Sequence, residues 1–226
     1  MRLKKYKKIT QLTKKFKFSD FDLLTNYGLL TGDTNLFKTI TIIELIESIR
    51  NIPGDIIEFG VWNGNTSLLI KKILDIKKIK KKVFLFDHFK GLKHYTKKDP
   101  KISHVYKDSY VAPKKKINSF INFFNFKNIK IIDKDATKIS HHDLKNFKFS
   151  LAILDMDLYL PTITALNAIE KKISKNGIIV FDEANKTLWE GEKKAMNEFL
   201  KKNPKKYHKT IISKSKQPDL ILMKIK

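Results

Sequence analysis

Short apolar runs alternate with amphipathic segments from residue 36 to the end of the chain. Residues 36–50, LFKTITIIELIESIR, carry apolar side chains three or four positions apart, a spacing that predicts an amphipathic helix. Further helices are expected over residues 66–76, 113–124, 161–173 and 191–202. Strands are expected at the short apolar runs 56–59, 83–86, 129–132, 151–154 and 177–181, and then at 210–213 and 220–224.

The order of these elements predicts an α/β fold with a doubly wound, mostly parallel seven-stranded sheet. The strands are short and almost entirely apolar, as expected where helices cover both faces of a sheet. Only a short Lys/Gln/Pro turn separates the last two strands, so they are expected to form a C-terminal antiparallel hairpin. That ending differs from the standard dinucleotide-binding sheet and is typical of the Rossmann-like class I methyltransferase fold. Residues 1–35 are expected to be a basic N-terminal arm that could act as a lid, and residues 36–226 a single domain.

Composition narrows the class of protein. The 226 residues are 42% hydrophobic and lack cysteine, which excludes a disordered polycation, a disulfide scaffold and a zinc–thiolate site. The chain has no apolar run near the roughly 20 residues that a membrane span requires, and its N-terminus has no secretory signal. A cytoplasmic protein is therefore expected.

The net charge of +24 suggests an acidic partner such as nucleic acid, an anionic membrane or a phosphorylated substrate. However, the lysines are spread along the whole chain, and arginine, the better fork for phosphates and base edges, occurs only at Arg2 and Arg50. Much of the charge is therefore attributed to a compositional bias with solvated lysines.

Polar residues follow the predicted strands, at the edge of the sheet where α/β folds bind ligands. The first such segment runs from Glu58 through Gly60 to Gly64, and its glycines allow close approach of the backbone to a ligand. The spacing is not GxGxxG, because Trp62 stands where a glycine would be expected, which disfavours a pyrophosphate loop. An ordinary turn between strand and helix is the competing interpretation.

Two further strand ends carry acids suited to a nucleoside. Asp87, at the end of the second strand, could accept two ribose hydroxyls. Asp135 follows the third strand, where an acid or its neighbouring backbone could meet an adenine. Each could instead be a turn or helix-capping residue.

The richest cluster consists of Asp155 and Asp157 after the fourth strand with Asp182 and Glu183 after the fifth. If these strands are neighbours, about 4.8 Å apart, up to four carboxylates converge. Their mutual repulsion requires a cation or shared protons. A hard divalent ion such as Mg²⁺ is one candidate, and nearby lysines are the other.

At these residues the sequence resembles the macrocin and mycinamicin sugar O-methyltransferases. Five motifs in order carry the resemblance: IPGDIIEFGVWNG at 52–64, FDHFKGL at 86–92, LDMDLY at 154–159, GIIVFD at 177–182 and GEKKAMNEF at 191–199. The tryptophan that departs from GxGxxG is part of the first motif of that family.

The resemblance implies a class I S-adenosyl-L-methionine-dependent O-methyltransferase that acts with Mg²⁺ on a hydroxyl of a sugar, glycan or natural-product precursor. The cofactor-binding residues it implies, together with those suggested above, are Glu58, Gly60, Val61, Trp62, Gly64, Thr66, Asp87, His88, Asp135 and Asp155. The metal ligands would be Asp157, Asp182 and Glu183, and the catalytic base Asp157 or Asp155. The acceptor could be anionic, and the protein could be a homo-oligomer.

Two other functions compete with this one. The charge favours a nucleic-acid-binding protein or nucleic-acid methyltransferase, but an NPPY-type segment and an arginine-rich stripe are both missing, so nucleic acid is an unlikely partner. A scaffold domain without catalytic activity would keep the fold, but the intact acidic residues argue against it.

Overall fold

The computed structural model describes residues 2–212 and 217–226, with side chains from residue 7 onward, and contains a seven-stranded sheet. The strands are β1 (Asp55–Phe59), β2 (Val83–Asp87), β3 (Ile129–Asp133), β4 (Phe149–Leu154), β5 (Ile173–Phe181), β6 (Tyr207–Ile211) and β7 (Leu220–Lys224). Their order is β3-β2-β1-β4-β5-β7-β6, in which β7 is antiparallel to both of its neighbours. The predicted mostly parallel sheet with a C-terminal antiparallel hairpin is confirmed.

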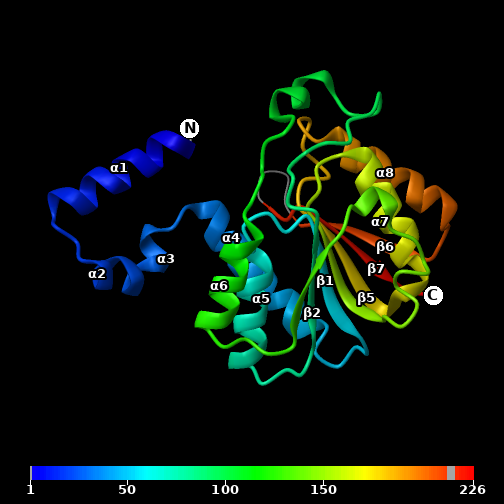
Figure 1. Ribbon diagram of the computed structural model, residues 1–226, viewed down its shortest axis with the longest axis horizontal. Coiled ribbons are helices and arrows are strands. Elements are labelled where there is room, and N and C mark those ends of the chain that lie inside the picture. Colours follow the sequence, from blue (N-terminus) through cyan, green and yellow to red (C-terminus); the bar gives the residue numbers. More distant parts are fainter. Residues whose placement is uncertain (1, 213–216) are drawn as a thin grey trace.

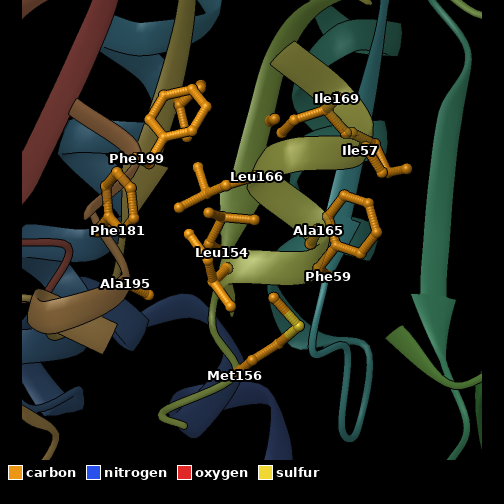
Figure 2. Packing of buried hydrophobic residues seen from close by; sticks show 14 of the residues in the cluster. Ile57, Phe59, Leu154, Met156, Ala165, Leu166, Ile169, Phe181, Ala195 and Phe199 are labelled. Atoms are coloured by element: carbon orange, nitrogen blue, oxygen red, sulfur yellow. The ribbon is translucent and has the colours of Figure 1, made fainter. Parts of the chain in front are cut away.

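Helices cover both faces of this sheet. They are α1 (Arg2–Lys15), α2 (Asp20–Thr25), α3 (Tyr27–Leu30), α4 (Asp33–Ser48), α5 (Asn65–Ile76), α6 (Lys114–Phe123), α7 (Tyr159–Ile169) and α8 (Glu190–Lys202), with short 3₁₀ turns at Lys101–Tyr106, Ala136–Lys138 and Glu170–Lys172. Apolar residues of α4, α5 and α6 pack on one face, and those of α7 and α8 pack on the other. Figure 2 shows the second of these layers, where Leu166 and Ile169 of α7 and Phe199 of α8 lie close to side chains of the strands.

The central strands are apolar because they are buried on both sides. In β1, Ile56 packs with α4 and α5, whereas the next residue, Ile57, packs with α7 on the opposite face. All six residues of β4 are buried in the same way. A strand between two helical layers has no solvent-facing side, so most of its polar side chains appear where it ends; the buried Glu58 of β1 is an exception.

The structure corrects two predicted boundaries near the fifth strand. The helix expected over 161–173 ends at Ile169, and a 3₁₀ turn over Glu170–Lys172 follows it. Ile173 is already the first residue of β5, because it is buried and pairs with Phe149 of β4. The strand thus begins four residues before the predicted 177.

Other boundaries differ less. The helix expected over 36–50 spans Asp33–Ser48, and its buried face is formed by Ile42, Leu45 and Ile46, so Leu36 and Ile40 remain exposed. The strand β6 starts at Tyr207, before the predicted 210, and residue 213 of that prediction lies outside the described residues.

The helices of the N-terminal arm extend away from the sheet, as Figure 1 shows for α1, α2 and α3. Ser19 caps α2 with its side chain, and Asp22 returns the bond by accepting from the Ser19 backbone N–H at 2.8 Å. Apolar side chains on the arm are exposed, among them Phe16 at 61% and Leu24 at 79%. Within residues 2–212 and 217–226, every helix is too short or too polar to span a bilayer.

Candidate active site

A cavity of about 490 Å³ lies at the carboxyl ends of β1, β2, β4 and β5. It is lined by Glu58, Gly60, Val61, Trp62, Thr66, Asp87, His88, Asp135, Asp155, Asp157, Asp182 and Glu183. Among the residues expected at the site, Gly64 does not line the cavity; it stands at the start of α5 with a left-handed backbone. Residues from Glu58 to Glu183, a stretch of 126 positions, therefore line the same cavity.

The turn after β1 approaches the end of β4 closely. Gly60 has a φ of +83°, and a Cβ atom there would lie 1.9 Å from the carbonyl oxygen of Asp155. Only glycine fits this position without moving one of the two strand ends. The close approach brings the glycine turn and the acidic cluster into the same cavity.

Asp87 joins that turn to the end of β2. Its Oδ2 accepts hydrogen bonds from the backbone N–H groups of Val61, at 2.8 Å, and Trp62, at 2.9 Å. Its Oδ1 accepts from the backbone N–H of Phe89 at 2.7 Å. Three charge-assisted bonds hold the carboxylate rigidly at the cavity wall.

Glu58 is almost completely buried at the floor of the cavity, where the Ser67 hydroxyl of α5 donates to its carboxylate. Burial raises its pKa to about 8, although the Ser67 hydrogen bond and the charge of Lys38 oppose the shift. A bound ligand with an amino group would be a favourable partner for this carboxylate.

His88, His94 and Asp135 form a second polar group on the side of β2 and β3. His94 Nε2 lies 2.9 Å from Asp135 Oδ2, while Asp135 Oδ1 accepts from the Thr137 backbone N–H at 2.9 Å. Over the described ranges, this is the one group of three or more metal-type donors whose atoms lie within 4.8 Å of one another. His88 Nδ1 already accepts a hydrogen bond from the Lys90 backbone N–H at 2.9 Å.

The acidic cluster contains a lysine that sequence analysis did not identify. Lys38 Nζ, from α4, lies 2.9 Å from Asp182 Oδ1 and 3.4 Å from Asp155 Oδ2. Its side chain is only 23% exposed, so the ammonium sits within the cluster rather than in solvent. Lysines as neutralising charges were one of the two alternatives, and Lys38 supplies part of that neutralisation.

One lysine does not balance the cluster. Burial and then the charge of Asp182 raise the pKa of Asp155 to about 7, even though Lys38 lowers it. Burial and then Asp155 raise the pKa of Asp157 well above its usual value, and burial and Asp182 raise that of Glu183 to about 8. The cluster thus keeps an excess of negative charge that favours protons or a further cation.

The members of the cluster have different surroundings. The Gln217 amide donates to the Glu183 carboxylate, which directs Glu183 toward the segment before β7. Asp157 has a φ of +63°, in the left-handed region that a non-glycine residue rarely adopts. Asp155 and Asp182, by contrast, both lie beside the same ammonium.

Aromatic side chains extend from the cavity wall to its rim. The rings of Trp62 and Tyr110 are 5.6 Å apart and perpendicular, those of Tyr110 and Tyr106 are 6.2 Å apart, and those of Tyr106 and Trp189 are 5.4 Å apart. Trp62, Tyr110 and Trp189 also line the cavity, and Trp62 is 43% exposed. Such a row of π faces suits the apolar face of a sugar or another ring.

Two residues that line the cavity, Lys38 and His94, lay outside the sequence-based prediction, as did two buried acids that are not part of its lining, Asp99 and Glu192. Nothing in the sequence distinguished Lys38 from the other lysines. The segment 88–113 has little apolar periodicity, so its sequence did not show where His94 and Asp99 lie. Glu192 lay within a helix motif, yet it is completely buried with both carboxylate oxygens unpartnered among the described residues. A charged residue on the apolar face of α8 was the signal that could have identified it.

Comparisons with known proteins agree with this geometry. A family model described as macrocin O-methyltransferase (TylF) matches residues 25–213. The demethyldecarbamoylnovobiocin O-methyltransferase of Streptomyces niveus is 27% identical over 157 residues, which are 59% of this chain and 54% of that protein. A tetracenomycin-C rhamnosyl 4'-O-methyltransferase of Streptomyces olivaceus is 22% identical over 145 residues, 58% of this chain and 53% of that protein. The chain spans about half the length of these curated relatives.

The fold also matches solved methyltransferases. The calicheamicin methyltransferase CalS11 superposes with a TM-score of 0.78, covering 98% of this chain and 91% of CalS11, at 19% identity. At that identity the likeness shows the fold alone, whereas the family model spans most of the chain and includes all five motifs. The chain therefore belongs to the macrocin O-methyltransferase family.

Proposed function

We propose that the protein transfers a methyl group from S-adenosyl-L-methionine to a hydroxyl of a sugar or of a glycosylated small molecule. The observation that carries the proposal is that the strand-end acids of the family motifs line one cavity. The relatives support the choice of acceptor, since one is named as methylating a rhamnosyl group and a second structure of CalS11 is described as a TDP-rhamnose 3'-O-methyltransferase.

The methyl donor would bind between β1 and β2. Gly60 leaves room for it, Glu58 faces its amino group and Asp87 its ribose, with Asp135 toward the adenine. When bound, the donor supplies an electrophilic methyl group on a sulfonium. The task of the protein is to hold an acceptor oxygen in line with that methyl, at about 3–3.5 Å.

Asp157 is the proposed proton acceptor. It lines the cavity, and no hydrogen bond to its carboxylate occurs among the residues that the structure describes. Its raised pKa, caused first by burial and then by Asp155, makes the ionised carboxylate a stronger base than a solvent-exposed aspartate. Asp155 is the alternative, although Lys38 competes for its oxygen.

The acidic cluster offers the donor chemistry of a hard divalent ion, because its carboxylate oxygens are in excess over the one ammonium. Among the described residues, however, no three carboxylates of the cluster have oxygens within 4.8 Å of one another, so binding of an ion requires these side chains to move closer together. Asp182 and Asp155 would hold such an ion, since they already share a cation, with Asp157 and Glu183 as the further ligands expected from the sequence. When bound, Mg²⁺ would supply Lewis-acid polarisation of the acceptor hydroxyl.

The cavity lining favours a neutral sugar ring as the part of the acceptor that enters the cavity. Seven carboxyl groups line it, from Glu58, Asp87, Asp135, Asp155, Asp157, Asp182 and Glu183, against the ammonium groups of Lys38 and Lys93. An anionic group of the acceptor, considered from the net charge of the chain, would be repelled by these carboxylates if it entered the cavity. A neutral sugar that stacks on Trp62 and Tyr110 suits it better.

The proposal is tested with Asp157→Asn. Label transfer from S-adenosyl-L-methionine to a panel of nucleotide-linked and glycosylated sugars should fall about 100-fold or more, because the proton acceptor is lost. Calorimetric affinity for S-adenosyl-L-homocysteine should change less than about threefold. Asp133→Asn, an exposed strand-end acid outside the cavity, is the matched control. Failure of the wild-type protein to bind S-adenosyl-L-homocysteine would refute the proposal.

A further inference from the structure

Lys38 occupies a position that a divalent ion would also favour. It lies in the N-terminal half of α4 and lines the cavity together with Thr34 and Asn35 of the same helix. Its ammonium reaches Asp182 at 2.9 Å and Asp155 at 3.4 Å, across the layer boundary between α4 and the sheet.

The two carboxylates come from neighbouring strands in register. Leu154, just before Asp155, pairs with Phe181, just before Asp182, so both acids leave the sheet at the same level. Two carboxylates at the same level can bind one cation between them. The ammonium of Lys38, from the helix α4, occupies that position.

A second cation between the same carboxylates would repel the ammonium. Two positive charges within a few ångströms of each other repel strongly at the effective dielectric of a protein surface, and a divalent ion doubles that repulsion. Lys38 is flexible, with four methylene groups, so it can withdraw toward solvent, but withdrawal gives up its ion pairs.

We propose that Lys38 is a built-in competitor of divalent cations at Asp155 and Asp182. In the resting protein its ammonium provides the positive charge, and a divalent ion binds only by displacing it. The protein therefore binds Mg²⁺ and Mn²⁺ weakly, and removal of Lys38 creates a tighter divalent site. The inference concerns the same carboxylates as the proposed function, and rests on it only for the consequence that assistance of turnover by Mg²⁺ requires a high concentration of the added ion.

The experiment compares Mn²⁺ binding by calorimetry and by electron paramagnetic resonance in the wild-type protein and in Lys38→Gln. The variant should bind Mn²⁺ about tenfold more tightly or better, and Mg²⁺ should raise its Tm more than it raises that of the wild type. Lys38→Arg, which keeps the charge, should bind Mn²⁺ as the wild type does. Adding Asp155→Asn to Lys38→Gln should abolish the gain.

Lys93→Gln is the matched control, because Lys93 also lines the cavity but pairs with Asp108 at 2.5 Å instead of with the cluster. Its Mn²⁺ affinity should equal that of the wild type. If Lys38→Gln folds only when a divalent ion is present, that result supports the proposal, since the ion replaces the missing ammonium.

Equal Mn²⁺ affinities in the wild type and Lys38→Gln would overturn the inference. Loss of S-adenosyl-L-homocysteine affinity in Lys38→Gln without any gain in metal affinity would overturn it too, because Lys38 would then serve the carboxylate of the methyl donor. Neither outcome depends on methyl transfer. A wild-type protein that fails to bind S-adenosyl-L-homocysteine would refute the proposed function and leave the metal comparison intact.

Discussion

Glu192 is the buried acid whose environment departs most from that of an ordinary glutamate. It lies in the first turn of α8, is 0% exposed and has both carboxylate oxygens unpartnered within the described part of the chain. Burial, followed by the charges of Asp157 and Asp155, raises its pKa well above the ordinary 4.5. The folded protein therefore holds Glu192 in its protonated, neutral form over a wider pH range than the unfolded chain does.

The raised pKa has a defined effect on stability. Below about pH 4.5 Glu192 is protonated in both states, and its contribution is fully present. As the pH rises, the unfolded chain ionises first, so stability falls until the pH passes the folded-state pKa. Glu192→Gln removes this dependence, and its Tm should exceed that of the wild type at pH 8, by about 2–4 °C per kcal/mol gained.

Thermal unfolding at pH 5 and pH 8 measures the difference. Glu190→Gln is the control, because Glu190 shares the first turn of α8 but is 46% exposed and pairs with Lys194. A gain for Glu192→Gln that is the same at both pH values would contradict the explanation by titration.

At the scale of single residues, the sequence identified side chains by their position after strands. Asp87, Asp155 and Asp182 could be placed at one edge because a buried strand displays its first polar residue where it ends. Lys38 and Glu192 could not be found this way, since both come from helices whose rotation about their axes depends on packing. That Lys38, among 45 lysines, turns toward the cavity is a property of the folded α4.

At the scale of elements, Asp99 fastens the segment between β2 and α6 to the start of α7. Its Oδ1 accepts the Tyr159 backbone N–H at 2.8 Å, and its Oδ2 accepts the Thr96 N–H at 2.7 Å and the Thr96 hydroxyl at 2.9 Å. Tyr159 opens α7, so Asp99 satisfies one of the amides that a helix N-terminus leaves unpaired. Gly191 of α8 packs so closely that a Cβ there would meet Asp99 Oδ1 at 1.9 Å.

Asp99→Ala should destabilise the protein by about 1–3 kcal/mol, because it leaves buried donors of α7 and Thr96 without an acceptor. Urea unfolding at pH 7 measures the loss. The control is Asp108→Ala in the same segment, whose solvent-exposed pair with Lys93 should contribute little to stability. Equal losses in the two variants would show that Asp99 does not fasten the segment.

The pattern of apolar residues predicted the alternation of strands and helices well, because each buried strand and helix face imposes its own period. It could not predict the segment 88–113, which has little regular structure and is held by side chains such as Asp99. The length of β5 was also missed, since Lys175 and Asn176 are exposed residues inside a strand that is otherwise buried.

At the scale of the whole molecule, the net charge of +24 and the acidic cavity have opposite signs. Acids on the surface pair with lysines, as Asp133 does with Lys114 at 2.9 Å and Asp143 with Lys134. The carboxylates of the cavity meet far fewer cations. The net charge therefore describes the exterior of the protein and is a poor guide to its ligand. In the sequence, the only sign of the acidic cavity was the clustering of acids after the strands.

The separation of the two charges predicts that polyanions bind outside the cavity. Retention of the protein on immobilised heparin should fall steeply between about 50 and 200 mM salt, since exposed lysines are screened and release counterions. Affinity for S-adenosyl-L-homocysteine, measured by calorimetry over the same range, should change less than about threefold, because the cavity groups are largely buried. Saturating RNA should leave that affinity unchanged. If RNA competes with S-adenosyl-L-homocysteine, the acidic cavity does not exclude polyanions and the nucleic-acid function regains support.

The variant Lys38→Gln separates the interior charge from the exterior charge. It removes a charge inside the cavity, so retention on heparin should stay at the wild-type level even where Mn²⁺ binding changes.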